Sequence, residues 1–235
     1  MDSLASTTLE AVTLLISGDR ELWNIIGISF RISTTAILLA VIPAVLIGFS
    51  LAYANFWGRR LLISFFNTLL AVPAVVVGLT LYIVLSRQGP LGEWQLLFTQ
   101  TAMVLGQIAL SFPILVAMSH SAFQSTEIRA WDTARTLQSN PIKAFFIIMR
   151  EVRFGLFSAL LAAYGRIIAE VGASMMLGGN ILHYTRNIPT AIALETSKGE
   201  FSQGIALGIV LVLIAFLLTI ILHYAQGKGA LAHER

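Results

Sequence analysis

The sequence predicts an all-α integral membrane protein, with five transmembrane helices in one bundle and a preceding helix at the membrane interface. Hydrophobic residues make up 57% of the chain and charged residues only 11%, whereas an average soluble domain has about 25% charged residues. Apolar stretches long enough to cross about 30 Å of hydrocarbon recur along the 235 residues. We therefore expect a single transmembrane domain over residues 1–235, with no room for a large soluble domain.

Five spans are expected, at about residues 28–53, 61–85, 99–123, 154–177 and 202–224. The first contains 20 consecutive uncharged residues, Thr34–Tyr53, which is the length of a membrane-spanning helix. Prolines interrupt the first three spans, and membrane helices tolerate proline where neighbouring groups satisfy the freed carbonyl. The fourth span ends at Gly178-Gly179-Asn180, where we expect the helix to unwind.

Residues 4–18 are moderately apolar but too short to span a bilayer. We interpret them as a helix at the interface, with Trp23 as an anchor; an unstructured tail is the alternative. They are not a secretory signal, because Asp2 and Glu10 precede the first basic residue, Arg20. Cysteine is absent, which excludes disulfides, a thiol nucleophile and a thiolate metal site.

The one long polar block, residues 127–153, holds five of the fifteen basic residues. Small and apolar residues at helical spacing over 130–137 predict one short helix. Asn140 followed by Pro141 is typical of the start of a second helix, and the apolar run 144–149 continues it. We expect two helices that meet at a corner outside the membrane and form a docking surface; an ordinary amphipathic loop is the alternative.

The basic residues indicate the topology, because they sit beside the spans and do not form a nucleic-acid patch. If residues 127–153 are cytoplasmic, nine basic residues lie inside: Arg59, Arg60, Arg129, Arg135, Lys143, Arg150, Arg153, Lys228 and Arg235. Five lie outside: Arg20, Arg31, Arg87, Arg186 and Lys198. The positive-inside rule therefore favours a multi-pass protein of the cell membrane with its N-terminus outside and its C-terminus in the cytoplasm.

The polar block resembles the EAA loop of ABC importer permeases, whose pattern is roughly E-A-A-x-x-L-G, an apolar helix and I-x-L-P. The residues that match are Asp132, Ala134, Arg135, Thr136, Leu137, Pro141, Ala144, Phe145 and Phe146. Asp132, Gln138 and Glu151 depart from the glutamate, glycine and proline of the pattern. The resemblance implies that this corner docks on an ATPase subunit through Asp132, Ala134, Arg135, Leu137, Asn140 and Pro141.

A second resemblance covers most of the chain. Residues 67–92 resemble the second span and following loop of molybdate and tungstate permeases. Residues 165–181, GRIIAEVGASMMLGGNI, and 190–201, TAIALETSKGEF, are more particularly similar to tungstate permeases. The resemblance implies the type I ABC importer fold. It also implies a homodimer that forms the translocation pathway, two ATPase subunits that carry the ATP and Mg²⁺, and an extracytoplasmic tungstate-binding protein.

Arg166 and Glu170 are four residues apart on the fourth span, so they share a face and can form an ion pair. Counted from Arg153, they lie about 20–25 Å from the cytoplasmic edge. Charges inside a membrane are expensive and usually face a bundle interior or a wet path. One hypothesis is that the pair lines or latches the pathway; the other is that it is a structural ion pair.

A tungstate dianion is best held by neutral hydrogen-bond donors near helix N-termini. Ser174, Asn180 and Thr190 are candidate donors, although each is also a normal packing or turn residue. The segment 181–200 is where the binding protein would touch, or else a plain connection. No metal-ligand spacing, catalytic triad or phosphate-binding loop is found, so we expect a non-catalytic chain without a cofactor.

The sequence thus predicts the permease subunit of an ATP-driven tungstate importer. One alternative is the same machine carrying molybdate or sulfate. A more distant alternative is an ion-coupled secondary transporter or a channel, which would work without a partner ATPase.

Overall fold

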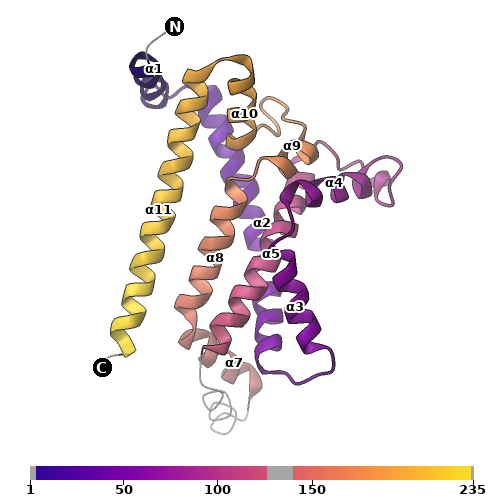
Figure 1. Ribbon diagram of the computed structural model, residues 1–235. Coiled ribbons are helices and arrows are strands. Elements are labelled where there is room, and N and C mark those ends of the chain that lie inside the picture. The colour runs from indigo at the N-terminus through magenta and orange to yellow at the C-terminus, as the bar shows by residue number, and fades with distance from the viewer. Residues whose placement is uncertain (1–3, 126–139, 234–235) are drawn as a thin grey trace. The chain divides into compact units, whose positions relative to one another are not determined.

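The computed structural model describes residues 4–125 and 140–233 of the chain. All of its regular elements within those ranges are helices (Figure 1). They are α1 (Leu4–Ile16), α2 (Arg20–Tyr53), α3 (Arg59–Leu69), α4 (Ala74–Leu85), the short 3₁₀-helix η1 (Gly92–Trp94), α5 (Gln100–Gln124), α7 (Pro141–Glu151), α8 (Arg153–Ile168), α9 (Gly172–Gly178), α10 (Ile188–Lys198) and α11 (Phe201–His233).

Three of these helices are long and apolar enough to cross a membrane: α2, α5 and the first part of α11. Two further spans are obtained if each bent helix pair, α3 with α4 and α8 with α9, is counted as one. The segments predicted as single spans at 61–85 and 154–177 are therefore each divided into two helices. The chain is an all-helical membrane protein with three to five candidate spans.

The chain forms two compact units that alternate along the sequence, and each is described by itself. The first unit comprises Met1–Ala36, Pro73–Leu110 and Gly165–Leu217. The second comprises Ile37–Val72, Ser111–Tyr164 and Leu218–Arg235.

In the first unit, α1 packs on the start of α2 and on α10 and α11. The buried residues of this cluster are Ala11, Leu22, Ile25, Ile26, Ile188, Ala191, Ala206 and Leu207. The opposite side of α1 exposes Leu9, Val12 and Ile16, which recur at helical spacing. A helix that is packed on one side and apolar on the other fits the predicted interfacial helix, whose depth in a membrane stays a prediction.

In the second unit, α7 packs beneath α2 and α5. The buried cluster contains Phe123 of α5 and Ala144, Ile148 and Val152 of α7 and its end. The ring of Phe49 on α2 lies between those of Phe123 and Phe145, with centroid distances of 5.3 and 4.8 Å and edge-to-face geometry. Edge-to-face aromatic contacts add to the burial energy, so α7 is fixed on α2 and α5.

Candidate functional site

The predicted docking corner lies partly outside the described residues, since Asp132, Ala134, Arg135 and Leu137 belong to the segment 126–139. The structure does describe the second half of the corner. Asn140 has extended backbone geometry and its side-chain oxygen accepts a hydrogen bond of 2.9 Å from the N–H of Ile142. Pro141 is the first helical residue. The predicted helix start at Asn140-Pro141 is therefore confirmed, and its role in docking stays a prediction.

Helix α7 has two different faces. Ala144 and Ile148, four residues apart, are buried in the second unit. Ile142 and Phe146, also four residues apart, are 64% and 60% exposed on another face. Sequence reasoning assigned the whole run 144–149 to one apolar helix and did not separate the buried face from the exposed one. The exposed face continues directly from the predicted docking corner.

The predicted ion pair between Arg166 and Glu170 is present, with 2.9 Å between Nη1 and Oε2. Its setting differs from the prediction, because α8 ends at Ile168 and Glu170 lies beyond the helix. The other carboxylate oxygen of Glu170 accepts a hydrogen bond of 3.3 Å from the N–H of Ala173, in the first turn of α9. A carboxylate at a helix start satisfies a free N–H and interacts favourably with the helix dipole. Glu170 thus joins α8 to α9.

A third side chain completes this joint. Gln107 of α5 is buried, and its Nε2 donates a hydrogen bond of 3.3 Å to the carbonyl of Ile167, in the last turn of α8. Helix ends leave carbonyl groups without partners inside the helix, and side-chain donors can satisfy them. We refer to Arg166, Glu170 and Gln107 as the α8–α9 joint. The side chain of Arg166 is 48% exposed, whereas that of Glu170 is only 8% exposed.

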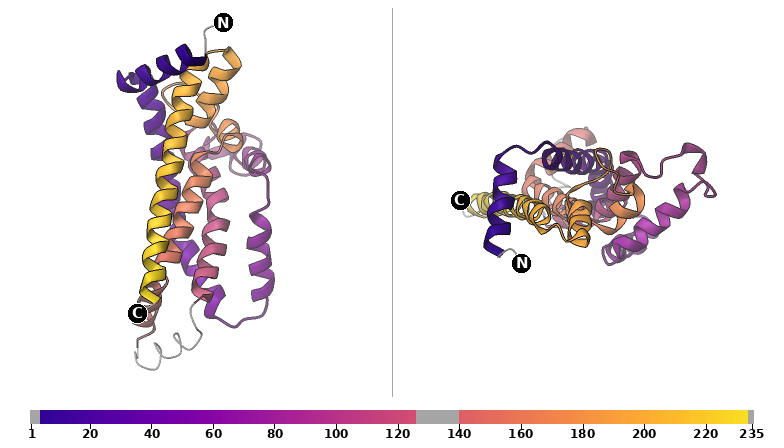
Figure 2. Two further views of the ribbon diagram at one scale, coloured as in Figure 1. Left: turned by 60° about the vertical axis from the view of Figure 1, so that its left-hand side comes forward. Right: turned by 90° about the horizontal axis from the view of Figure 1, so that it is seen from above.

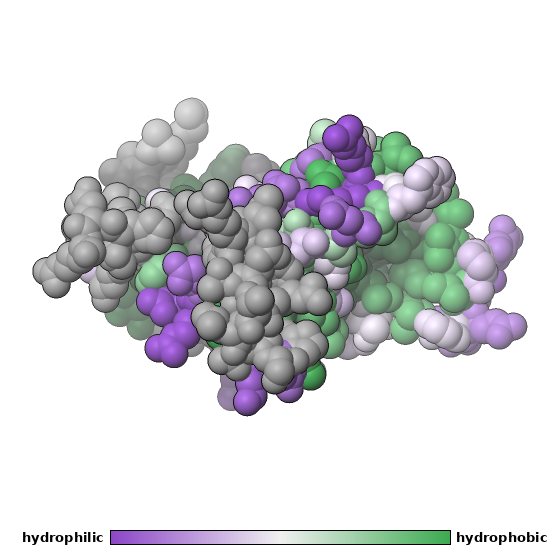
Figure 3. All heavy atoms as spheres, turned by 90° about the horizontal axis from the view of Figure 1, so that it is seen from below, coloured by the Kyte–Doolittle hydropathy of each residue, from purple (hydrophilic) through white to green (hydrophobic). Residues whose placement is uncertain are grey.

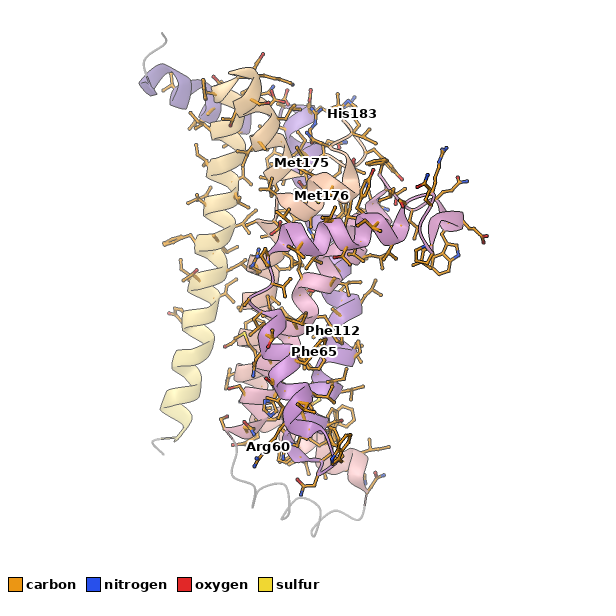
Figure 4. All side chains as sticks on the ribbon, turned by 45° about the vertical axis from the view of Figure 1, so that its right-hand side comes forward. Arg60, Phe65, Phe112, Met175, Met176 and His183 are labelled. Atoms are coloured by element: carbon orange, nitrogen blue, oxygen red, sulfur yellow. The ribbon has the colours of Figure 1, made fainter. Side chains whose placement is uncertain are left out.

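Glycines let α9 lie very close to its neighbours. A Cβ atom at Gly78 of α4 would lie 2.8 Å from the Cα of Ala173, and one at Gly172 would lie 2.8 Å from a methyl group of Val75. The views agree that α4 and α9 lie side by side (Figures 1 and 2). Figure 4 shows Met175 and Met176 on this short helix, and a Cβ atom at Gly78 would also lie 3.2 Å from the sulfur of Met176.

Two of the predicted substrate donors belong to a buried hydrogen-bond network. Asn187 caps α10: its side-chain oxygen accepts from the N–H of Thr190, while the hydroxyl of Thr190 accepts from the N–H of Asn187. The amide nitrogen of Asn187 donates to the hydroxyl of Ser174 at 3.3 Å. Ser29 of α2 accepts from the N–H of Ile188 at 2.7 Å. Ser174 and Thr190 therefore bond to the protein's own polar groups.

The third predicted donor, Asn180, lies in the turn after α9. The helix ends at Gly178, where unwinding is predicted, and Gly179 and Asn180 both have positive φ, 67° and 52°. Asparagine tolerates this left-handed region better than most residues. Thr185 holds the turn through a hydrogen bond of its hydroxyl to the carbonyl of Gly178. The side-chain oxygen of Asn180 is buried and has no hydrogen-bond partner within the described part of the chain.

Sequence reasoning missed Gln107, Asn187 and Ser29. Gln107 and Ser29 are uncharged polar residues in predicted spans, Asn187 is a polar residue in the connection 181–200, and neither signal gives a partner. Among the described residues, no three His, Asp or Glu side chains gather as they would around a metal ion. What the site offers is one half-exposed guanidinium, buried neutral hydrogen-bonding groups and a short helix between tightly packed neighbours.

A family model described as the binding-protein-dependent transport system inner membrane component matches residues 44–228. The chain belongs to this family. It is thus the non-catalytic, multi-pass inner-membrane permease component of an ABC importer, and such a transporter implies ATPase and binding-protein partners. This result agrees with the predicted ABC permease and disagrees with the alternative of a secondary transporter or channel.

The chain is similar in sequence to permeases of several anion transporters. The tungstate uptake system permease protein TupB of Campylobacter jejuni is 41% identical over 214 residues, which cover 91% of this chain and 90% of that protein. The probable anion ABC transporter permease protein of Haloferax volcanii is 40% identical over 193 residues, 80% of this chain and 83% of that protein. The molybdenum transport system permease protein ModB of Escherichia coli K12 is 29% identical over 188 residues, 76% of this chain and 82% of that protein.

The permease fold is also found among solved structures. An inward-facing form of the MetNI methionine ABC transporter contains a chain that superposes with a TM-score of 0.64, covering 89% of this chain and 94% of that one. Its sequence identity is 12%, so this likeness concerns the fold alone.

Proposed function

We propose that this permease is the transmembrane subunit of a tungstate importer. The observation that carries the proposal is the 41% identity over 91% of the chain with a tungstate uptake permease. The sequence identity with a molybdenum permease is lower, 29% over 76% of the chain. Two copies would form the pathway between them, and an extracytoplasmic binding protein would deliver the tungstate. The N-terminus would lie outside and the C-terminus in the cytoplasm.

Coupling to the ATPase would occur through residues 127–153. The described half supports this proposal in two ways. One face of α7 is fixed on α2 and α5, so a push on the helix reaches the spans and is not absorbed by a loose loop. Another face presents Ile142 and Phe146, and exposed apolar side chains grouped on one face are typical of a protein interface. In the full complex these two side chains would be covered by the ATPase.

The α8–α9 joint would lie along the translocation pathway. Ser174 and Thr190 are occupied by Asn187, so in this proposal they keep the shape of the site and do not hold the anion. Arg166 keeps half of its side chain exposed although it pairs with Glu170. A partly neutralised guanidinium attracts an oxyanion weakly, and weak attraction suits a path that the ion must also leave.

Reconstitution tests the substrate. The permease would be placed in liposomes with its ATPase and binding protein, and ATP-dependent uptake of tungstate would be measured with molybdate and sulfate as competitors. We expect tungstate uptake that excess sulfate leaves unchanged. Stronger uptake of molybdate would assign the transporter to molybdate, the second candidate, which the 29% identity to the molybdenum permease favours. Uptake without the ATPase would contradict the proposed mechanism.

A reversal of charge tests the coupling segment. Asp132→Lys should abolish uptake by weakening ATPase docking, while tungstate binding to the separate binding protein remains unchanged. Lys228→Gln, a change of one charge in the C-terminal tail, is the control and should leave uptake intact. If the Asp132→Lys complex still retained its ATPase at full strength, the docking surface would lie elsewhere.

A further inference from the structure

The turn between α2 and α3 holds an unusual combination of side chains in the second unit. It borders an open hollow of about 830 Å³ whose lining includes Asn55, Trp57, Arg59, Arg60 and Gln124. None of the described residues that line it is acidic. Figure 3 views the molecule from this end, where hydrophilic and hydrophobic residues lie next to one another. The lining of the hollow thus combines the positive charges of Arg59 and Arg60 with the apolar ring of Trp57.

The two arginines differ in their hydrogen bonds and in their exposure. Arg59 is fixed by neutral oxygens: its Nε donates to the carbonyl of Leu51 at 2.6 Å and its Nη2 to that of Ala52 at 2.9 Å. These bonds hold the guanidinium at the end of α2, and among the described residues no carboxylate forms an ion pair with it. Arg60 is exposed, and within the described ranges it has no ion-pair partner. Figure 4 shows it at the start of α3.

The aromatic residues place this hollow at a membrane surface. Trp57 is 96% exposed, and Phe56 beside it is also exposed. Both come directly after the apolar run of α2 that ends at Tyr53. Tryptophan is enriched where the hydrocarbon meets the headgroups. From there α3 continues with exposed Leu61 and Phe65, and none of its residues is buried within the chain.

We propose that this hollow binds the headgroup phosphate of an anionic phospholipid. Arg60 would pair with the phosphate, which a planar guanidinium can contact through two N–H groups. The fixed charge of Arg59 would add attraction, and Trp57 would lie at the level of the glycerol backbone. The apolar side of α3, with Leu61 and Phe65, would contact the acyl chains. A lipid is favoured over a soluble anion because the exposed apolar side chains continue along α3 as far as Leu70, and only a lipid has acyl chains to cover them.

This site would be next to the coupling segment. Gln124, which lines the hollow, is the last residue of α5, and only Ser125 separates it from the segment 126–139. The hydroxyl of Tyr53 donates a hydrogen bond of 3.0 Å to the carbonyl of Phe123 and ties the end of α2 to the end of α5. A bound lipid would therefore stabilise the base from which the coupling segment leaves the membrane.

The test uses the permease in complex with its ATPase, reconstituted with Trp57 as the only tryptophan. Trp23, Trp94 and Trp131 are changed to Phe. Fluorescence quenching is compared for phosphatidylglycerol and phosphatidylcholine that carry bromine near the headgroup end of the acyl chain. We expect phosphatidylglycerol to be preferred about fivefold at Trp57, the effect of roughly one surface charge. Arg60→Gln should reduce the preference to nearly none, whereas Arg87→Gln, an exposed arginine outside the hollow, should leave it unchanged.

Three outcomes would overturn the proposal. Equal quenching by both lipids in the parent protein would show that no anionic lipid is selected. Loss of the preference in millimolar inorganic phosphate would assign the hollow to soluble phosphate. Loss of ATPase co-elution in Arg60→Gln with the preference intact would assign it to the ATPase. If the single-tryptophan protein does not fold, native mass spectrometry of the Arg60→Gln and Arg87→Gln complexes with all four tryptophans replaces the fluorescence. Fewer retained phosphatidylglycerol molecules in Arg60→Gln alone are then expected, and equal retention contradicts the site.

Discussion

Two apolar segments of the chain are interrupted, one between α3 and α4 and one between α8 and α9, and different groups stabilise the two breaks. Between α3 and α4, Pro73 has extended geometry (φ −61°, ψ 134°) and no side-chain cap accompanies it. The N–H groups of Leu70, Ala71 and Val72 donate to carbonyls three residues earlier in the chain. Between α8 and α9 there is no proline, and the break is held by the side chains of Arg166, Glu170 and Gln107.

The difference shows two ways of satisfying the backbone where a helix is interrupted in a membrane. In the first, local backbone bonds suffice, because the proline has no N–H to satisfy and a 3₁₀-like turn uses the three N–H groups that precede it. In the second, there is one such backbone bond, from the N–H of Glu170 to the carbonyl of Ile167, and a charged pair and an amide from a distant helix supply the other partners. We therefore expect the α8–α9 joint to be sensitive to single side-chain changes and the Pro73 break to tolerate them.

The largest effect is expected from Glu170→Ala, which removes both the ion pair and the hydrogen bond to the start of α9. The loss of a nearly buried carboxylate with two partners should destabilise the fold by about 2–3 kcal/mol. For a chain of this size the melting temperature would fall by about 4–12 °C, measured on the purified complex in detergent. Glu170→Gln keeps an oxygen for the N–H of Ala173 and should lose about half as much. Equal losses would mean that the hydrogen bond contributes nothing.

Gly78→Ala tests the packing of α4 on α9. The added methyl group would meet the backbone of Ala173 at 2.8 Å, where no flexible side chain can move away. Overpacking of this kind costs about 1–3 kcal/mol, visible as a lower melting temperature. Gly27→Ala is the matched control, because α2 has open space at that position. An unchanged melting temperature for Gly78→Ala would show that α4 and α9 separate easily.

Gln107→Leu should have a smaller effect, about 1 kcal/mol. It removes the donor to the carbonyl of Ile167. It also removes the buried side-chain oxygen of Gln107, which has no partner among the described residues, and this gain offsets part of the loss. The double variant Gln107→Leu, Glu170→Ala measures the coupling between the two side chains. If the melting-temperature shift of the double variant equals the sum of the two single shifts, Gln107 and Glu170 stabilise the fold independently of each other.

The smallest effect is expected from Pro73→Ala, below about 1 kcal/mol, because the break depends on local backbone bonds and the substitution mainly adds freedom to the unfolded chain. Thermal unfolding of the same complex provides the value. A larger loss for Pro73→Ala than for Glu170→Ala would reverse the comparison between the two breaks.

The sequence predicted those features that depend on near neighbours in the chain. The membrane helices follow from continuous apolar runs of about 20 residues. The helix start at Asn140-Pro141 and the pairing of Arg166 with Glu170 follow from spacings of four residues or fewer. Pro73 indicates an interruption of the second span. A proline is compatible both with a kink in one helix and with two separate helices, so it does not tell which of the two forms. Helix α8 ends before Glu170, whose carboxylate accepts a hydrogen bond from the N–H of Ala173. The periodicity of the sequence does not indicate this bond.

The features that could not be predicted join distant parts of the chain. Gln107 bonds 60 residues away, to Ile167, and Ser29 bonds 159 residues away, to Ile188. Ser174 and Thr190 are predicted as donors for the anion because they are polar residues near helix starts, but the sequence does not show that Asn187 bonds to both of them. The exposed face of α7 could not be identified either, since Ile142 and Ala144 are both apolar and only the position of α2 and α5 separates them.

The glycine contacts between α4 and α9 also restrict how these helices can move. Gly78 faces Ala173 while Gly172 faces Val75, so each helix fills the gap left by the other at two points. Neither helix can slide along the other without a clash at one of these points. If the permease alternates between two states, α4 and α9 must travel together as one rigid block, and the bending must take place in the residues that flank the block.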